Sequence, residues 1–189
     1  MVKTRKIVLV AILSALSFCL MLFSFPLIPG ADFLKIELSI LPILLGMYLL
    51  DLKVAYVILL LRTLLKFVLN NRGVNDLIGL PMNVLALALF VTVFALVWKG
   101  RGSRLAYVWA SLLGTGLLTM AMLGLNLVYA IPLYAKFANF DINQYIGRDI
   151  YLFQMVLPFN LLQGIIFSLV FGLMYGLLKP VLVRYKYEK

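Results

Sequence analysis

The sequence predicts an all-α integral membrane protein, a bundle of six transmembrane helices with both termini in the cytoplasm. Hydrophobic residues make up 65% of the 189 residues and charged residues only 13%, and a water-soluble domain cannot hide that much apolar surface. The apolar residues fall into runs close to the ~20 residues that cross a bilayer. The net charge of +10 comes from short basic clusters between these runs, which argues against a nucleic-acid partner.

Six apolar segments account for the predicted helices, which form one membrane domain over residues 1–189. Their expected bounds are 7–25, 38–50, 53–71, 80–98, 105–131 and 157–178. The first segment follows basic residues, as in a signal peptide, but it lacks a small-residue cleavage site, so we expect it to be retained. The second is short and contains Pro42 and Gly46, so we expect it to be tilted or broken.

The basic residues set the expected orientation. If the N-terminus is cytoplasmic, 11 of the 17 lysines and arginines lie on the cytoplasmic side, as the positive-inside rule requires. The outer loops are then 26–37, 70–79 and 132–157, which are longer and richer in polar and aromatic residues than the inner ones. We therefore expect this multi-pass protein of the plasma membrane to recognise solutes at its outer face.

The usual catalytic groups are scarce. The chain has no histidine, and its single Cys19 has no second cysteine to pair with. Its seven acidic residues lie at or beyond the ends of the predicted helices, and no G-x-x-x-x-G-K-[ST] phosphate loop occurs. We therefore expect no catalytic, cofactor or metal site and no ATP hydrolysis by the chain itself, which disfavours a membrane enzyme.

Neutral polar side chains at one depth indicate a binding site. Asn83, Asn126, Asn160 and Gln163 each lie near the outer end of a predicted helix. Asn160 and Gln163 share a helix face, and the adjacent Gly164 allows close approach of another backbone. Carboxamides donate and accept hydrogen bonds without imposing a charge, which suits a neutral ligand. Helix-to-helix hydrogen bonding is the competing interpretation.

Three further features lie in the first three predicted helices and the first outer loop. Ala11, Ser14 and Ala15 are small residues about one turn apart, which let another helix come close. The first outer loop, F-P-L-I-P-G-A-D-F-L-K-I-E, combines prolines with apolar residues and is interpreted as either a lid or an ordinary connection. Arg62 lies near mid-membrane, so we expect it to face protein or water.

Several stretches in this order resemble the substrate-binding S component of an energy-coupling-factor vitamin transporter, specifically the riboflavin-specific type. They cover nearly the whole chain and comprise the A-x-x-x-A of Ala11 and Ala15, F-L-K-I-E-L-S-I-L-P at 33–42, Asn83 after Gly79, Leu80 and Pro81, and P-F-N-L-L-Q-G at 158–164.

The resemblance implies six helices that hold riboflavin near the outer face under the first outer loop. Leu34, Lys35 and Glu37 would belong to or border this lid. Asn83, Asn160 and Gln163 would hydrogen-bond the ribityl chain or the polar ring edge, and Asn126 and Tyr129 are added from their position. The resemblance also implies a transmembrane T component and two cytoplasmic ATPases, contacted through the small face of the first helix.

Two alternatives remain at this point. One is an S component for another vitamin: thiamine, a cation, would call for acids or an aromatic cage, and biotin, a carboxylate, for a basic partner. The carboxamides favour a neutral ligand over both. The other alternative is a scaffold subunit of the membrane that binds no ligand.

Overall fold

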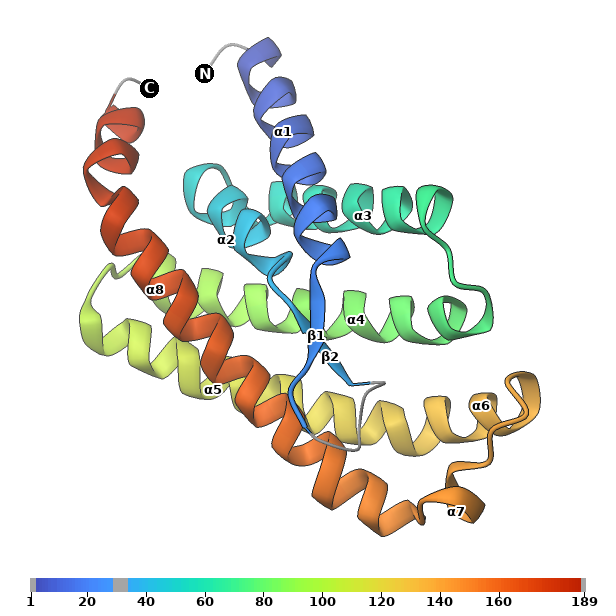
Figure 1. Cartoon of the computed structure of the whole chain (residues 1–189). Helices are drawn as coiled ribbons and strands as arrows, with labels where there is room; N and C mark the ends of the chain where they lie inside the picture. The colour runs from blue at the N-terminus through green and yellow to red at the C-terminus, as the bar shows by residue number, and fades with distance from the viewer. Residues whose placement is uncertain (1–2, 29–33, 188–189) are drawn as a thin grey trace.

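In the computed structural model the chain is described over residues 3–28 and 34–187, and helices dominate it (Figure 1). The first part contains α1 (Lys3–Leu22), the strands β1 (Ser24–Pro26) and β2 (Lys35–Glu37), α2 (Ile40–Leu49) and α3 (Leu52–Leu69). Next, α4 (Val74–Val93) continues into the π-helical segment η1 (Phe94–Lys99), and α5 (Arg104–Leu125) continues through η2 (Asn126–Ala130) into α6 (Ile131–Phe137). The short α7 (Ile142–Tyr145) precedes η3 (Ile150–Val156), which continues into α8 (Leu157–Tyr187).

The prediction of an all-α chain is wrong in one respect, because two short strands form an antiparallel hairpin. Ser24 pairs with Glu37 and Pro26 with Lys35. Strands of three residues are too short to show the alternating pattern that reveals a strand in a sequence. Figure 1 shows the hairpin extending from the end of α1 toward α5 and α8. Residues 29–33 of the expected lid, Phe33 among them, lie outside the described residues.

The described residues contain four helical stretches that are long and apolar enough to cross a membrane. These are Thr4–Leu22, Val74–Lys99, Arg104–Phe137 and Ile150–Pro180. Hydropathy and length therefore do not establish six spans, because α2 has only 10 residues and α3 is interrupted by basic residues. With α7 included, the described residues form seven continuous helical segments, one more than predicted.

The charges of α3 turn inward. Arg62 and Lys66 are both buried, although each would be costly if it faced lipid. The exposed side chains of this helix are mostly apolar and include Val57, Leu60, Leu61, Leu64, Phe67 and Val68. The outer face of α3 is thus compatible with lipid even though the helix as a whole is not uniformly apolar.

Three helical stretches extend further toward the expected outer side than predicted. The fourth predicted helix begins at Val74 instead of residue 80. The fifth predicted helix runs on to Phe137, and the last begins at Ile150, so the loop expected over 132–157 is reduced to residues 138–149. Asn83, Asn126 and Asn160 each lie nine to eleven residues from the nearer end of their helical stretch, roughly 15 Å at the helical rise. All three lie further along their helical stretches than the one or two turns expected, and they do not share one depth, because Asn126 contacts Tyr151 near the start of η3.

Aromatic side chains fill the bundle around η1. The ring of Trp98 meets Phe94 and Phe171 edge-on, with centroid distances of 6.2 and 5.7 Å, and stacks against Tyr48 at 5.5 Å. Edge-to-face and offset-stacked pairs are the favoured aromatic geometries. This end of the bundle is densely packed, so a ligand has no room there.

Two charged side chains hold the junction between α2 and α3. Lys99 donates a hydrogen bond to the Met47 carbonyl at 2.6 Å, where α2 ends. Asp51 accepts the backbone N–H of Val54 at 2.7 Å and pairs with Lys6 at 3.3 Å. Partial burial raises the pKa of Asp51, but the Val54 N–H and the Lys6 ammonium outweigh it and lower that pKa overall.

Gly164 sets the separation of α5 and α8. A Cβ atom at this position would overlap the Thr115 side chain, and both residues are buried. Only glycine permits this approach of the two helices.

Replacing Gly164 by alanine should lower the free energy of unfolding by about 1–3 kcal/mol, because overpacking forces the two helices apart. Thermal unfolding in detergent measures the effect. Gly176→Ala on the same helix is the matched control, since a Cβ atom there meets nothing within 4 Å. Equal melting temperatures for the two variants would contradict this role of Gly164.

Candidate functional site

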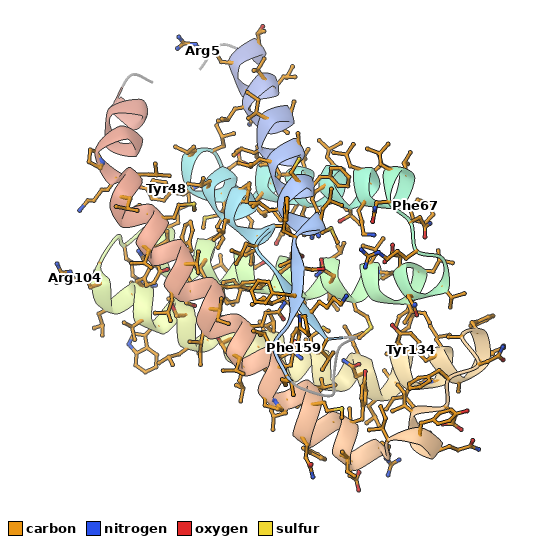
Figure 2. The ribbon with its side chains drawn as sticks, viewed as in Figure 1. Arg5, Tyr48, Phe67, Arg104, Tyr134 and Phe159 are labelled. Carbon is orange, nitrogen blue, oxygen red and sulfur yellow. The ribbon has the colours of Figure 1, made fainter. Side chains whose placement is uncertain are left out.

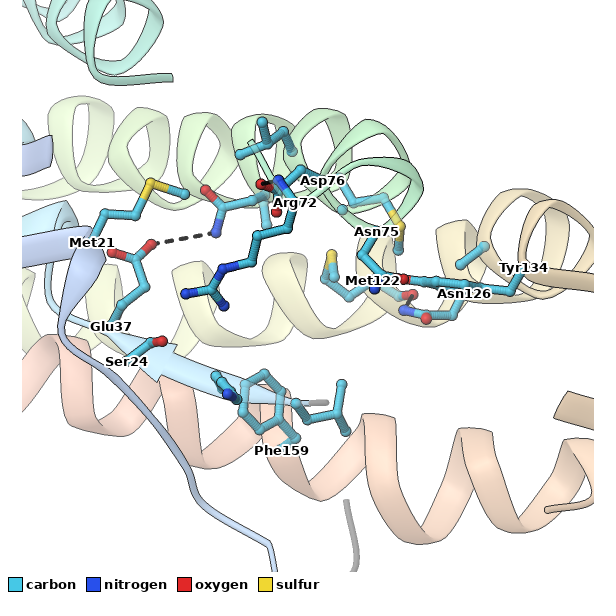
Figure 3. Close-up of a pocket in the computed structure, with 18 of the residues that line it drawn as sticks. Met21, Ser24, Glu37, Arg72, Asn75, Asp76, Met122, Asn126, Tyr134 and Phe159 are labelled. Carbon is cyan, nitrogen blue, oxygen red and sulfur yellow. Dashed lines mark hydrogen bonds between the residues drawn. The ribbon is translucent and has the colours of Figure 1, made fainter. Parts of the chain in front are cut away.

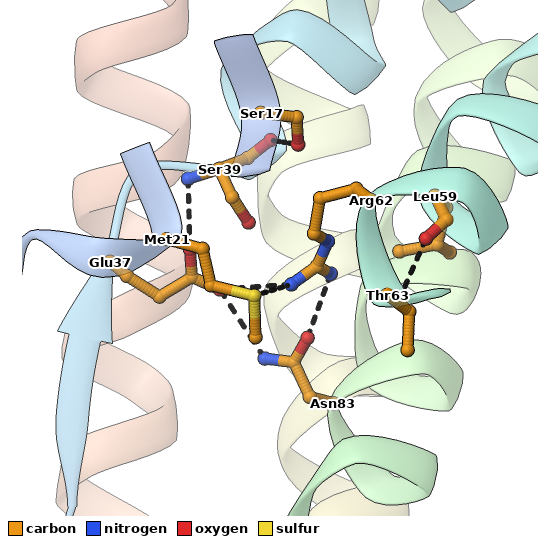
Figure 4. Close-up of polar contacts among 8 residues, drawn as sticks. All are labelled: Ser17, Met21, Glu37, Ser39, Leu59, Arg62, Thr63 and Asn83. Atoms are coloured by element: carbon orange, nitrogen blue, oxygen red, sulfur yellow. Dashed lines mark hydrogen bonds and ion pairs between the residues drawn. The ribbon is translucent and has the colours of Figure 1, made fainter. Parts of the chain in front are cut away.

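A buried ion pair links the hairpin to α3. Arg62 is fully buried, as its position predicted, and its Nη1 lies 3.5 Å from Oε1 of Glu37 in β2 (Figure 4). Nη2 donates to Oδ1 of Asn83 at 2.8 Å, and Nη1 contacts the sulfur of Met21 at 2.8 Å. Glu37 lies beyond the helix ends, as expected, but the hairpin carries its side chain into the interior.

The connection from β2 to α2 fixes Glu37 further. The backbone N–H of Ser39 donates to Oε2 of Glu37 at 3.1 Å. The Ser17 hydroxyl on α1 donates to the Ser39 carbonyl at 2.6 Å (Figure 4). The end of β2 is therefore attached to α1, α3 and α4 at once, and it cannot shift without breaking hydrogen bonds to all three helices.

A cavity of about 950 Å³ lies beside this ion pair. That volume is at the upper end of the roughly 300–1,000 Å³ typical of small-molecule sites. Its walls come from α1, β2, α3, α4, the α5–η2–α6 stretch and the η3–α8 stretch (Figure 3). Apolar and aromatic side chains, among them Leu34, Leu87, Tyr134, Tyr151 and Phe159, contribute to the lining.

The structure brings most of the predicted binding residues to this cavity. Those that line it are Leu34, Lys35, Glu37, Asn83, Asn126, Asn160 and Gln163. Tyr129 instead packs in a small cluster with Ile78 and Met82, and Gly164 serves the contact of α5 with α8. Whether the lining residues contact a ligand stays a prediction.

The carboxamides differ in how much of their hydrogen-bonding capacity the protein already uses. The oxygen of Asn83 is engaged by Arg62, and its nitrogen faces Glu37 at 3.5 Å. Gln163 is 7% exposed and makes no side-chain hydrogen bond to the residues that the structure describes. Gln163 is therefore freer to bond a ligand than Asn83.

A second charged cluster, which the sequence analysis did not assign to the site, forms one rim of the cavity. Lys66 pairs with Asp76 at 2.7 Å and donates to the side chain of Asn70 at 2.9 Å. The backbone N–H of Arg72 also donates to Asp76, and Figure 3 shows the Arg72 side chain extending into the cavity. The sequence does contain a signal for this cluster, because the spacing of Arg62 and Lys66 puts both on one face of α3.

The small residues of α1 do not share one face. Ala11 and Ala15 are exposed, whereas Ser14 is 3% exposed and donates to the Val10 carbonyl at 2.8 Å. Ser14 lies about 60° around the helix from Ala11 and about 100° from Ala15, on the side that meets the bundle, and whether it takes part in the expected partner surface stays a prediction. The exposed small surface is limited to Ala11 and Ala15.

Comparison with known proteins gives a consistent family. The family model described as "ECF transporter, substrate-specific component" matches residues 5–175. Among solved structures, one described as the S component of a bacterial ECF transporter superposes with a TM-score of 0.79. That alignment covers 95% of this chain and 98% of the other at 24% sequence identity, so it supports the fold.

Curated relatives include several riboflavin transporters. RibU of Streptococcus thermophilus is 56% identical over 184 residues, which cover 97% of this chain and 87% of that protein. RibU of Leuconostoc mesenteroides is 41% identical over 97% of this chain and 95% of its own length. The riboflavin transporter FmnP of Bacillus subtilis is 28% identical, with 94% of each chain covered.

Removing the charge of Arg62 should be far more damaging than removing an exposed charge. Arg62→Met leaves Glu37 buried without its partner, and we expect a loss of about 3–5 kcal/mol in the free energy of unfolding. Lys6→Met, the control, breaks the half-exposed Lys6–Asp51 pair and should cost at most ~1 kcal/mol. Thermal unfolding in detergent measures both.

A second substitution distinguishes the stability lost through the unpaired charge from the stability lost through poorer packing. Adding Glu37→Gln to Arg62→Met removes the unpaired carboxylate, so part of the lost stability should return. If the double variant is no more stable than Arg62→Met alone, the loss comes from packing and not from the isolated charge.

Proposed function

The chain belongs to the family of energy-coupling-factor (ECF) transporter substrate-specific components, and we propose that it is the subunit that binds riboflavin from outside the cell. It is a multi-pass protein of the plasma membrane. The observation that carries the proposal is the cavity between β2, α4 and the two long C-terminal helical stretches, on which the predicted carboxamides and the hairpin converge.

The lining of the cavity suits riboflavin. A flat three-ring system gains from apolar and aromatic burial, which Leu34, Leu87 and Phe159 supply. A few hydrogen bonds then decide which vitamin is accepted, and Asn126, Asn160 and Gln163 are the groups we assign to the ring edge or the ribityl hydroxyls. Binding involves no covalent chemistry, and riboflavin is the transported ligand, not a cofactor.

The hairpin supplies the lid in this proposal. Leu34 and Lys35 stand at the end of β2 nearest the loop, and Glu37 at its other end is bound to Arg62. The attached end acts as the hinge, so the loop-side end opens to admit riboflavin and closes over it. The Arg62–Glu37 contact keeps the hairpin in register with the pocket throughout.

The membrane arrangement in this proposal has six spans and both termini in the cytoplasm, within one domain over residues 1–189. The inward charges of α3 support counting it as a span, because its outer face is apolar. The first turn of α1 and the last turns of α8 lie toward the same side of the molecule (Figure 1), as an even number of spans requires. α2 is then the short sixth span.

Energy for uptake comes from partner subunits in this proposal. The sequence has no phosphate loop, so ATP hydrolysis falls to two cytoplasmic ATPases that act through a transmembrane T component. The exposed Ala11 and Ala15 of α1 form the surface on which the T component packs. Reorientation of the loaded bundle against it releases riboflavin inside.

Riboflavin should bind saturably to the detergent-purified protein and lose its fluorescence as it enters the aromatic-lined cavity, while thiamine and biotin should not compete. The double variant Asn160→Ala, Gln163→Ala should raise the dissociation constant at least about tenfold, or ~1.4 kcal/mol. Asn143→Ala, Gln154→Ala is the matched control, since both of these carboxamides are exposed and outside the cavity lining. Unchanged fluorescence with flavin-free wild-type protein would overturn the riboflavin assignment.

Enlarging the small surface of α1 should separate binding from uptake. In cells that take up riboflavin only through this chain, the double variant Ala11→Leu, Ala15→Leu should reduce riboflavin uptake more than about tenfold. The affinity for riboflavin should stay unchanged. Gly124→Leu, at an exposed position of α5 where a Cβ atom meets nothing, should leave both unchanged. Normal uptake by the leucine variant would show that the T component packs elsewhere.

A further inference from the structure

Two asparagines of the cavity are oriented by backbone carbonyls. The side-chain nitrogen of Asn126 donates to the Met122 carbonyl at 2.8 Å, and that of Asn160 donates to the Val156 carbonyl at 2.7 Å. A carbonyl oxygen can only accept a hydrogen bond. In each asparagine the end that faces the carbonyl must therefore be the nitrogen, which settles the direction of the opposite, oxygen end.

The oxygens of the two asparagines have different surroundings. Oδ1 of Asn126 accepts the hydroxyl of Tyr151 at 2.5 Å, and both side chains are 3% exposed. Oδ1 of Asn160 is buried and has no hydrogen-bond partner among the described residues. A buried polar atom without a partner is costly. The Asn126 oxygen therefore has its hydrogen bond within the protein, whereas the Asn160 oxygen needs a donor.

The two residues of the Asn126–Tyr151 contact both lie in π-helical segments. Asn126 is the first residue of η2, and Tyr151 lies in η3, which packs against η2. A π-helical segment changes the direction of its side chains relative to an α-helix and is frequent at functional sites. Here the two segments bring a tyrosine hydroxyl onto the Asn126 oxygen. Figure 3 shows Asn126 at the cavity wall.

We propose that Tyr151 is a positioning residue that makes Asn126 a hydrogen-bond donor to the ligand, while Asn160 acts as an acceptor. With one lone pair of its oxygen bound to Tyr151 and one N–H bound to Met122, Asn126 is held in a fixed orientation, and its second N–H is its unengaged donor. It therefore contacts an acceptor atom, such as a ring carbonyl or ring nitrogen of riboflavin. Asn160 Oδ1 receives an N–H or O–H group.

The two asparagines address different parts of the ligand. Nine residues along the η3–α8 stretch separate Tyr151, which contacts Asn126, from Asn160, or roughly 13 Å of helical rise. An elongated ligand with an acceptor toward one end and a donor toward the other satisfies both. This inference rests on the proposed function, because it assumes that riboflavin occupies the cavity.

A double-mutant cycle with riboflavin tests the role of Tyr151. Tyr151→Phe keeps the ring but removes one of the two hydrogen bonds that hold the Asn126 amide and leaves its oxygen without that donor, so the dissociation constant should rise about tenfold, or ~1.4 kcal/mol. Asn126→Ala should cost a similar factor alone and much less in the Tyr151→Phe background, because the two residues act as one unit. A purely structural tyrosine would give additive effects.

Tyr56→Phe is the matched control. Its hydroxyl makes a comparably short bond to Thr92 at 2.6 Å, but Tyr56 is outside the cavity lining, so riboflavin affinity should stay at the wild-type value. Melting temperatures of all variants without ligand separate loss of fold from loss of binding. An unchanged dissociation constant for Tyr151→Phe, or an additive cycle, would overturn the inference.

Asn126→Asp provides an independent measurement that leaves Tyr151 in place. Aspartate still accepts the Tyr151 hydroxyl but supplies no N–H, so binding should be as weak as in Asn126→Ala. Binding at wild-type strength would mean that Asn126 contacts the ligand through oxygen, which contradicts the proposal. Absence of riboflavin binding by the wild-type protein would instead refute the proposed function, and the two failures are thus distinguishable.

Discussion

The buried contact between Arg62 and Glu37 holds the hairpin in place and so fixes one wall of the cavity. The rest of the candidate site depends on this contact. Either charge alone would cost several kcal/mol in the interior of a membrane protein, and pairing makes their burial tolerable. The pair locks β2 against α3, and Asn83 brings α4 to the same point. A hairpin of two three-residue strands would not be stable in isolation, so its position depends on this contact.

The two ends of the bundle serve different purposes. Around Trp98 the helices meet through interlocking aromatic rings, which leave no space and hold α2, α5 and α8 together. Toward the other end α4, the α5–η2–α6 stretch and the η3–α8 stretch line the cavity, where polar side chains join the aromatic ones. Dense packing at one end allows the bundle to keep its shape while the other end remains hollow.

The sequence predicted the long apolar helices and most of the residues that line the cavity, because apolar runs and carboxamide spacing are local signals. Tertiary contacts decided what it missed. Glu37 sits beyond any helix, and only the hairpin carries it to Arg62. The segments 132–137 and 150–156 fall outside the predicted apolar runs yet are helical. Tyr151 falls in the segment expected to be the last outer loop, but its hydroxyl turns inward to Asn126.

α3 illustrates a general limit of hydropathy in proteins of this kind. A helix that lines a polar cavity must carry polar or charged groups on its inner face, as Arg62 and Lys66 do. Averaging over all faces then lowers its apparent hydrophobicity, although its lipid-facing side is apolar. α4 and the two C-terminal helical stretches, which supply most of the cavity lining, are recognised by hydropathy. The undercounting of α3 therefore follows from its buried charges and not from its distance to the cavity.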